Sequence, residues 1–247
     1  MSDSEEQKAP RFDIGQFGED VRRVLVVTAH PDDLETGCGG TIRLLVCGGI
    51  EVSLLLCTTG NIGTHDPAHT RETLAATRQR EQLAAAEAMG LKQVIFLSHP
   101  DGELVADLSL RAEVAGIYRR VQPDTLFTFD PYWSGQAHPD HTAAGRAAVD
   151  AYMPSKMELY HPEQLVGDVK VADIKRIFFL GGGDRPGQIT IDIASTFAEK
   201  VEAIKLHVSQ FGDNMEEALK WLTEWNHNIG KCCGLEYAES FAPMAGW

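Results

Sequence analysis

The chain has 247 residues, of which 43% are hydrophobic and 23% charged, and its formal net charge is −14. This composition predicts a soluble globular protein, and so acidic a chain is a poor partner for nucleic acid or an anionic membrane surface. No apolar run reaches the roughly 18 residues of a membrane span, and the polar, acidic start lacks the features of a secretory signal. We therefore expect a cytoplasmic protein that binds a small molecule, with residues 1–20 as a disordered or loosely attached tail and residues 21–247 as one domain.

Strand-like and helix-like segments alternate along the first two thirds of the chain. Val24–Ala29 is an apolar, β-branched run that predicts a strand buried on both faces, and Gly37–Val46 then predicts a helix with a glycine-rich start. Further strands are expected over Glu51–Cys57, Gln93–Leu97 and Thr125–Phe129, and further helices over Arg71–Met89, Asp107–Val121 and Pro139–Tyr152. This order predicts βαβ units and a mostly parallel sheet.

The last third of the chain is less regular. Strands are expected over Ile177–Leu180, Ile189–Ile193 and Leu235–Phe241, and helices over Ser195–Gln210, capped by Ser195, and Glu216–Trp225. The predicted fold is α/β, a Rossmann-like three-layer sandwich with a mostly parallel central sheet and a smaller, irregular α+β C-terminal part.

Polar residues that can carry chemistry follow the first four strands. These segments are His30–Asp33, Asn61–His69, His99–Asp101 and Asp130–His141. Because the carboxyl ends of parallel strands line one edge of a sheet, where ligands of such folds bind, we expect the segments to border a single crevice.

Two of these segments have the spacing of metal ligands. The sequence AHPDD places His30 and Asp33 three residues apart in a turn stiffened by Pro31, and HPDH places His138 and His141 within one helical turn. Two histidines with one carboxylate and an open position for water are typical of a catalytic zinc site, beside which a further carboxylate can act as general base. Either segment alone can be a helix cap or a surface histidine, so the combination favours a metal site.

Other chemistries have weak support in the sequence. A P-loop, a G-x-S-x-G elbow and an H-E-x-x-H helix are absent, and the Gly37–Gly40 segment lacks the third glycine of a dinucleotide fingerprint. Cys38, Cys47 and Cys57 are expected in the core, while the adjacent Cys232 and Cys233 form no C-x-x-C pair.

In order and context, the two motifs resemble the AHPDD and HxDH signatures of the PIG-L/LmbE family of zinc-dependent de-N-acetylases. The likeness covers roughly residues 22–242, and its further segments are Arg78–Glu81, Pro100–Gly102, Lys205–Gln210 and Tyr237–Glu239. The resemblance implies an enzyme that removes an N-acetyl group from an N-acetylated amino sugar or its conjugate. It also implies Zn²⁺, or another divalent transition metal such as Fe²⁺, as cofactor, and a homo-oligomer.

The resemblance also implies a role for each motif residue. His30, Asp33 and His141 would hold the metal. Asp32 would be the general base that takes a proton from the attacking water. His138 would be protonated and would stabilise the oxyanion or protonate the leaving amine, with Asp140 holding it through a hydrogen bond.

Four residues are candidates for substrate binding. Arg78 and Asp101 would grip sugar hydroxyls, although Arg78 can instead pair with Glu81 on one helix. Trp133 can stack on a sugar face or fill the core. Gln136 stands where some family members carry a tyrosine that assists the oxyanion, so a tyrosine-assisted mechanism is not expected here.

Several alternatives stay open. Residues 61–69 carry two histidines and an aspartate, and they can form a surface loop, a substrate lid or a second metal site. The enzyme can also be a zinc amidase for another N-acyl substrate, such as a thiol conjugate or a natural product. A catalytically inactive, Rossmann-type sugar-binding module is a further alternative, against which the complete set of metal ligands argues.

Overall fold

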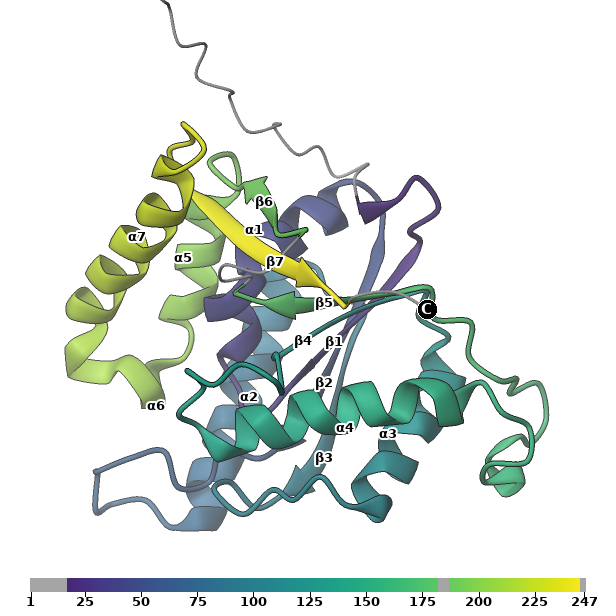
Figure 1. Ribbon diagram of the computed structural model, residues 1–247. Coiled ribbons are helices and arrows are strands. Elements are labelled where there is room, and N and C mark those ends of the chain that lie inside the picture. Colours follow the sequence, from purple (N-terminus) through teal and green to yellow (C-terminus); the bar gives the residue numbers. More distant parts are fainter. Residues whose placement is uncertain (1–16, 182–186, 245–247) are drawn as a thin grey trace, which may run out of the picture.

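A seven-stranded sheet forms the centre of the computed structural model, which describes residues 17–181 and 187–244 (Figure 1). Its strands are β1 (Arg23–Thr28), β2 (Glu51–Thr58), β3 (Gln93–His99), β4 (Thr125–Thr128), β5 (Arg176–Leu180), β6 (Ile189–Asp192) and β7 (Ala238–Pro243). The α-helices are α1 (Asp33–Cys47), α2 (Arg71–Met89), α3 (Leu108–Val121), α4 (Pro139–Ser155), α5 (Phe197–Lys205), α6 (Val208–Phe211) and α7 (Met215–Lys231). Short 3-10 helices cover Pro162–Gln164 and Gly212–Asn214.

The strand order β3-β2-β1-β4-β5-β7-β6 places the direction change of the chain between β1 and β4. The first five strands pair in parallel, and β7 is antiparallel to both of its neighbours. From β1 the chain moves outward through β2 and β3, and it returns to the other side of β1 as β4. Connections that diverge from two adjacent parallel strands leave a crevice at their carboxyl ends, which is the usual ligand site of such folds.

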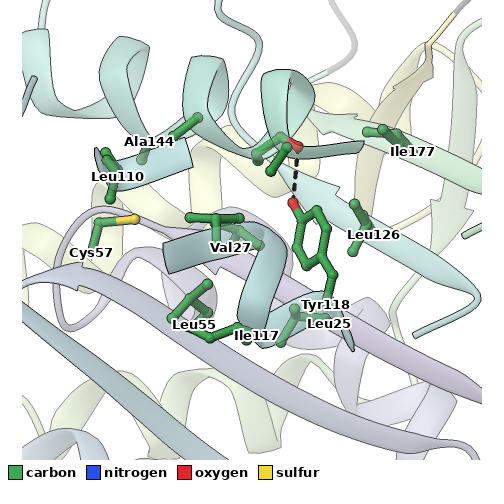
Figure 2. Close-up of a cluster of buried hydrophobic side chains, with 14 of the residues drawn as sticks. Leu25, Val27, Leu55, Cys57, Leu110, Ile117, Tyr118, Leu126, Ala144 and Ile177 are labelled. Carbon is green, nitrogen blue, oxygen red and sulfur yellow. Dashed lines mark hydrogen bonds between the residues drawn. The ribbon is translucent and has the colours of Figure 1, made fainter. Parts of the chain in front are cut away.

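Helices cover both faces of the sheet, and the strand side chains alternate between them (Figure 1). Leu25 and Val27 pack toward α3 and α4, where Tyr118 donates a hydrogen bond from its hydroxyl to the carbonyl oxygen of Ala148 at 2.9 Å (Figure 2). Val24 and Val26 pack on the opposite face, toward α1. The predicted α/β sandwich with a mostly parallel sheet is confirmed, and its irregular C-terminal part extends the same sheet through β5, β7 and β6.

The beginning of the described chain is attached to the core. Phe17 is fully buried and meets Phe127, Phe178 and Phe241 edge to face, with ring centroids 5.0–5.9 Å apart. Phe17, which the sequence analysis assigned to a loose tail of residues 1–20, is thus held by aromatic packing. Residues 1–16 of that tail lie outside the described residues.

Three local expectations differ from the structure. Helix α1 begins at Asp33, four residues before the expected start, and a Cβ on Gly40 would lie only 2.8 Å from Ile193, so its glycines allow close packing on the C-terminal part. The expected helix 195–210 is divided into α5 and α6, and its N-cap is Thr196. Cys38 and Cys57 are buried as expected, whereas Cys47, at the end of α1, is exposed.

Within the described chain, no helix is both long enough and apolar enough to cross a membrane.

Candidate active site

The first motif forms the turn between β1 and α1. The Asp33 carboxylate accepts hydrogen bonds from the backbone N–H groups of Ala29, at 3.1 Å, and His30, at 2.7 Å. The turn therefore holds this carboxylate in place through its own backbone. Burial would raise the pKa of Asp33, but hydrogen bonds from His141 and His30 outweigh burial and hold the pKa well below its ordinary range.

The second motif lies at the start of α4, after β4, on the other side of the crevice. His141 Nε2 lies 3.2 Å from Asp33 Oδ1 and 3.3 Å from His30 Nδ1, and His30 Nδ1 lies 3.5 Å from Asp33 Oδ2. Ligand atoms about 2.0–2.1 Å from a tetrahedral zinc ion stand about 3.3 Å apart. The structure thus brings the three residues expected to bind the metal within 3.2–3.5 Å of one another, with each histidine next to a different oxygen of Asp33.

Two carboxylates stand behind His30. Its Nε2 atom lies 3.0 Å from Asp101 Oδ1 and 3.4 Å from Asp140 Oδ2. Burial opposes protonation of His30, but contacts with Asp101 and Asp33 outweigh burial and raise its pKa to about 10. A carboxylate behind a ligating histidine is the usual arrangement in metal sites, because it fixes the ring and leaves the other nitrogen for the metal.

The same histidine belongs to two other groups of convergent donors. They are His30 with His138 and His141, and His30 with Asp101 and Asp140. Because both groups share His30, the described residues that could hold a metal ion lie around one point in the crevice. His65 and His69, on the loop 61–69, belong to none of these sets.

Asp32 lies beside the ligands in a strained backbone conformation. Its φ is 89°, a region that favours glycine, and such strain is concentrated at functional sites. Arg78 Nη2 lies 3.1 Å from Asp32 Oδ2, and the Asp32 N–H donates to Gln82 Oε1 at 3.0 Å. Burial raises the pKa of Asp32 to about 6, against the opposing charge of Arg78. A carboxyl group with such a pKa is suited to exchange protons near neutral pH.

Comparison with known proteins adds independent evidence. Residues 25–152, which hold both motifs, match the GlcNAc-PI de-N-acetylase (PIG-L) family. The diacetylchitobiose deacetylase of Thermococcus kodakarensis is 30% identical, over 95% of this chain and 88% of that protein. The chain belongs to the PIG-L family.

Other PIG-L proteins support the assignment. A probable N-acetyl-α-D-glucosaminyl L-malate deacetylase of Bacillus cereus is 33% identical over 81% of this chain and 94% of its own length. The solved N,N'-diacetylchitobiose deacetylase of Pyrococcus horikoshii has a TM-score of 0.87 and 30% identity, covering 94% of this chain and 87% of that one. The family resemblance and the N-deacetylase class predicted from the motifs are confirmed.

In this PIG-L protein, His138 is the N-cap of α4. Its Nδ1 atom accepts the Asp140 N–H at 3.2 Å, and Gln136 Oε1 accepts the His138 N–H at 3.1 Å. Burial and the neighbouring rings of His30 and His141 lower the pKa of His138. The capping bond leaves the proton of a neutral His138 on Nε2, so this side chain can serve as a neutral donor; the protonated form implied by the resemblance stays a prediction.

The Asp140 carboxylate also has a different environment from the one expected. It accepts the backbone N–H groups of Gly102, at 2.7 Å, and Leu104, at 3.2 Å. With its 3.4 Å contact to His30, these bonds tie the loop after β3 to the start of α4. The Asp140 carboxylate therefore contacts His30, whereas the hydrogen bond between Asp140 and His138 is made by the Asp140 backbone N–H.

Arg78 and Asp101 were expected to grip a sugar, but both side chains are buried. Arg78 is 3% exposed, and it donates to the carbonyl oxygens of Pro31, at 2.7 Å, and Gly60, at 3.0 Å, besides Asp32. Asp101 is 4% exposed against His30. Both residues contact groups of the first motif, and their expected contact with a sugar stays a prediction.

The alternative pairing of Arg78 with Glu81 is not found among the described contacts. Glu81 instead accepts the backbone N–H of Ser209 at 2.8 Å and its hydroxyl at 2.6 Å. This bond pair ties α2 to α6.

Sequence reasoning missed a chain of buried residues behind Asp32. Gln82 Nε2 donates to Glu35 Oε1 at 2.7 Å, and Glu35 Oε2 lies 3.5 Å from His207 Nε2. All three side chains are fully buried. Polar residues at otherwise apolar helix positions were the available signal. His207 lies between α5 and α6, at the break in the expected helix, and its ring is buried against Glu35.

The backbone of α4 comes very close to the end of β4. A Cβ on Gly145 would lie 2.3 Å from the carbonyl oxygen of Phe129, whose ring stacks on the His141 ring at a centroid distance of 3.9 Å. This contact sets the height of the second motif above the sheet. Trp133, in the loop between them, is 56% exposed and is not a core residue.

Proposed function

We propose that this PIG-L enzyme hydrolyses the acetamide group of an N-acetylated amino sugar, or of its conjugate, at a metal ion held by His30, Asp33 and His141. The observation that carries the proposal is the convergence of their donor atoms to 3.2–3.5 Å beside the strained carboxylate of Asp32. Deacetylases of diacetylchitobiose and of an N-acetylglucosaminyl malate among the relatives support the substrate class.

The donor set fits Zn²⁺, and two histidines with one carboxylate also accept other divalent transition metals such as Fe²⁺. When bound, the ion would acidify a water molecule and polarise the acetamide carbonyl. Because Asp101 contacts His30 Nε2, the Nδ1 atom is the one left for the metal. The raised pKa of His30 means that metal binding at neutral pH must displace a proton from this ring.

Asp32 is the general base in this proposal. Its carboxylate takes a proton from the water that attacks the acetamide carbon. Arg78 and Gln82 hold the carboxylate and the backbone of Asp32, so its position does not depend on the substrate. The protonated Asp32 can then pass its proton toward the departing amine.

His138 stabilises the oxygen that gains charge. In its neutral form it carries a proton on Nε2, which can donate to the acetamide oxygen as the carbonyl becomes tetrahedral. Gln136 Oε1 accepts the backbone N–H of His138, and the backbone N–H of Asp140 donates to His138 Nδ1, so neither hydrogen bond uses Nε2. Acetate and a primary amine are the products.

The direct test is product analysis with the metal-loaded protein. Incubation with N,N'-diacetylchitobiose and with N-acetylglucosaminyl L-malate is expected to release acetate and primary amine in equal amounts from at least one of them. Release only from substrates with longer N-acyl groups would favour an amidase for another N-acyl substrate. Saturable sugar binding without any acetate would favour the inactive sugar-binding module.

Two further proposals concern the whole protein. Homo-oligomerisation, implied by the family resemblance, is tested by light scattering, and a monomer would contradict it. A cytoplasmic location is tested by fractionation of the source cells.

A further inference from the structure

The junction between α5 and α6 reaches the back of the candidate active site. His207 is the residue before α6, and its ring is fully buried. Its Nε2 atom faces Glu35 Oε2 at 3.5 Å, and Glu35 Oε1 accepts a hydrogen bond from Gln82 Nε2 at 2.7 Å. Gln82 Oε1 in turn accepts the backbone N–H of Asp32 at 3.0 Å. These contacts form one continuous line from His207 to the proposed base.

The amide of Gln82 fixes the direction of this line. Its oxygen accepts from the Asp32 N–H, so its nitrogen is the donor, and Glu35 is the acceptor. The second oxygen of Glu35 is then left for His207. Burial would lower the pKa of His207, but its contact with Glu35 outweighs burial and raises the pKa. This direction favours a ring that donates to Glu35.

Fold stability does not account for this line of buried polar side chains. Glu35, Gln82 and His207 are all fully buried. Burial of an imidazole and a carboxylate costs free energy, and apolar residues of similar volume are often equally or more stabilising. The line ends at Asp32, whose φ is 89°, and such a conformation persists only where neighbouring contacts hold it. A role in holding Asp32 therefore gives these polar residues a purpose that packing does not.

The position of His207 is itself fixed from α2. Two residues further along the chain, Ser209 donates its backbone N–H at 2.8 Å and its hydroxyl at 2.6 Å to the carboxylate of Glu81. Glu81 and Gln82 are adjacent in α2, so the bonds to α6 and to Asp32 leave from neighbouring residues of one helix. A displacement of His207 would therefore also strain the bonds that tie α6 to α2.

We propose that His207 is a positioning residue for the general base: through Glu35 and Gln82, it holds the backbone of Asp32 in the orientation that the reaction needs. The inference rests on the proposed function, in which Asp32 takes a proton from the attacking water. The described polar contact of the His207 ring is with Glu35 and not with a metal ligand. Its loss should therefore lower the rate of the chemical step and leave metal content and KM close to their parental values.

Two substitutions of similar size separate the polar contact from simple packing. His207→Leu fills the space but cannot donate to Glu35, and we expect kcat to fall by about tenfold with KM nearly unchanged. His207→Gln carries an amide N–H that can replace the imidazole Nε2 donor, so kcat should stay within about twofold of the parental value. If His207→Leu does not fold, His207→Asn takes its place, because asparagine is too short to reach Glu35.

The matched control is His227→Leu, which makes the same change at an exposed position of α7 and should keep the parental kcat. A parental kcat in His207→Leu would overturn the proposal. A kcat in His207→Gln as low as that of His207→Leu would also overturn it, because the donor to Glu35 would then have no effect.

A double variant shows whether His207 acts through Gln82. If the contacts form one path, a second break in the path adds nothing. The protein that carries both His207→Leu and Gln82→Leu should therefore lose about tenfold in kcat, no more than Gln82→Leu alone. Independent effects would multiply to about a hundredfold, and that result would overturn the proposed path.

Amide hydrogen exchange tests the same path without any turnover. On a peptide that spans residues 29–36, the Asp32 N–H should exchange faster in His207→Leu than in the parental protein and at nearly the parental rate in His207→Gln. If the parental enzyme releases no acetate, the proposed function fails, and the exchange rates alone decide whether His207 holds the turn. If acetate is released while kcat and exchange in His207→Leu are both parental, this inference fails and the proposed function stands.

Discussion

The two motifs of the site are held in different ways. The turn His30–Asp33 is enclosed, with His30 and Asp33 side chains that are 7–8% exposed and fixed by backbone N–H groups and buried carboxylates. The second motif stands at a helix N-terminus, where the His141 side chain is 20% exposed and a largely exposed loop precedes it. The site thus has an enclosed half, which holds two of the proposed metal ligands and the proposed base, and a more open half, which carries His138 and His141.

Loss of Asp33 should break the enclosed half completely. Asp33→Ala removes a ligand and also the acceptor of two backbone N–H groups, so we expect the purified protein to contain no stoichiometric metal and to release no detectable acetate. Elemental mass spectrometry measures the metal. Asp213→Ala, on the exposed Gly212–Asn214 segment, is the control and should keep the parental metal content. Retention of about one metal per chain by Asp33→Ala would contradict the ligand assignment.

Asp32→Asn should separate chemistry from metal binding. The change keeps the size of the side chain and removes the base, so kcat should fall by about 10²–10⁴-fold while metal content stays at the parental level. A variant that keeps most of the parental kcat would show that Asp32 is not the base.

The pH dependence of kcat/KM tests the role of Asp32 as general base without a substitution. Asp32 must be deprotonated to accept a proton, and its raised pKa of about 6 means that protonation removes the base as pH falls. We expect kcat/KM to lose about tenfold per pH unit below about pH 6, provided that metal content is verified at each pH. The acid limb should disappear from the residual activity of Asp32→Asn, and its persistence there would assign the limb to another group.

His138 tests the open half. His138→Ala should lower kcat by about 10²-fold, because it removes a donor to the developing oxyanion, and should leave the metal bound. Because His138 also caps α4, His138→Asn is the informative companion: asparagine caps a helix well but does not reach as far as the imidazole Nε2. Full recovery of kcat in His138→Asn would mean that His138 acts only as a cap.

The smallest expected effect concerns the support behind Asp32. Gln82→Leu removes the acceptor of the Asp32 N–H and the donor to Glu35, so we expect kcat to fall by about tenfold, or about 1.4 kcal/mol, with little change in KM. Gln79→Leu makes the same substitution at an exposed position of α2 and should be neutral. Equal kcat values in the two variants would show that the strained turn at Asp32 keeps its conformation without the hydrogen bond to Gln82.

The sheet and the place where the two motifs meet could be predicted from the sequence. The apolar run of β1 and the alternation of strands with helices predicted the sheet, and the rule for carboxyl ends predicted where the two motifs would meet. The start of α1 was expected at Gly37, whereas the helix already begins at Asp33, inside the first motif; Gly39 and Gly40 lie within the helix and serve close packing on the C-terminal part.

The supporting residues could not be predicted in the same way. Arg78 and Asp101 have the side chains of sugar ligands, and the sequence does not reveal that they are buried against Asp32 and His30; their contact with a sugar stays a prediction. The division between α5 and α6 likewise falls at His207, whose neighbour Glu35 lies far away in sequence. Contacts of this kind leave no periodicity that a single sequence reveals.

The close approach of Gly145 to the carbonyl oxygen of Phe129 has a consequence for sequence variation. Every other residue type carries a Cβ, and at this position that atom would act as a wedge between α4 and β4. The wedge would lift the helix together with His141, even though residue 145 touches neither metal nor substrate. A position without a side chain thus limits which sequences can keep the two halves of the site in register.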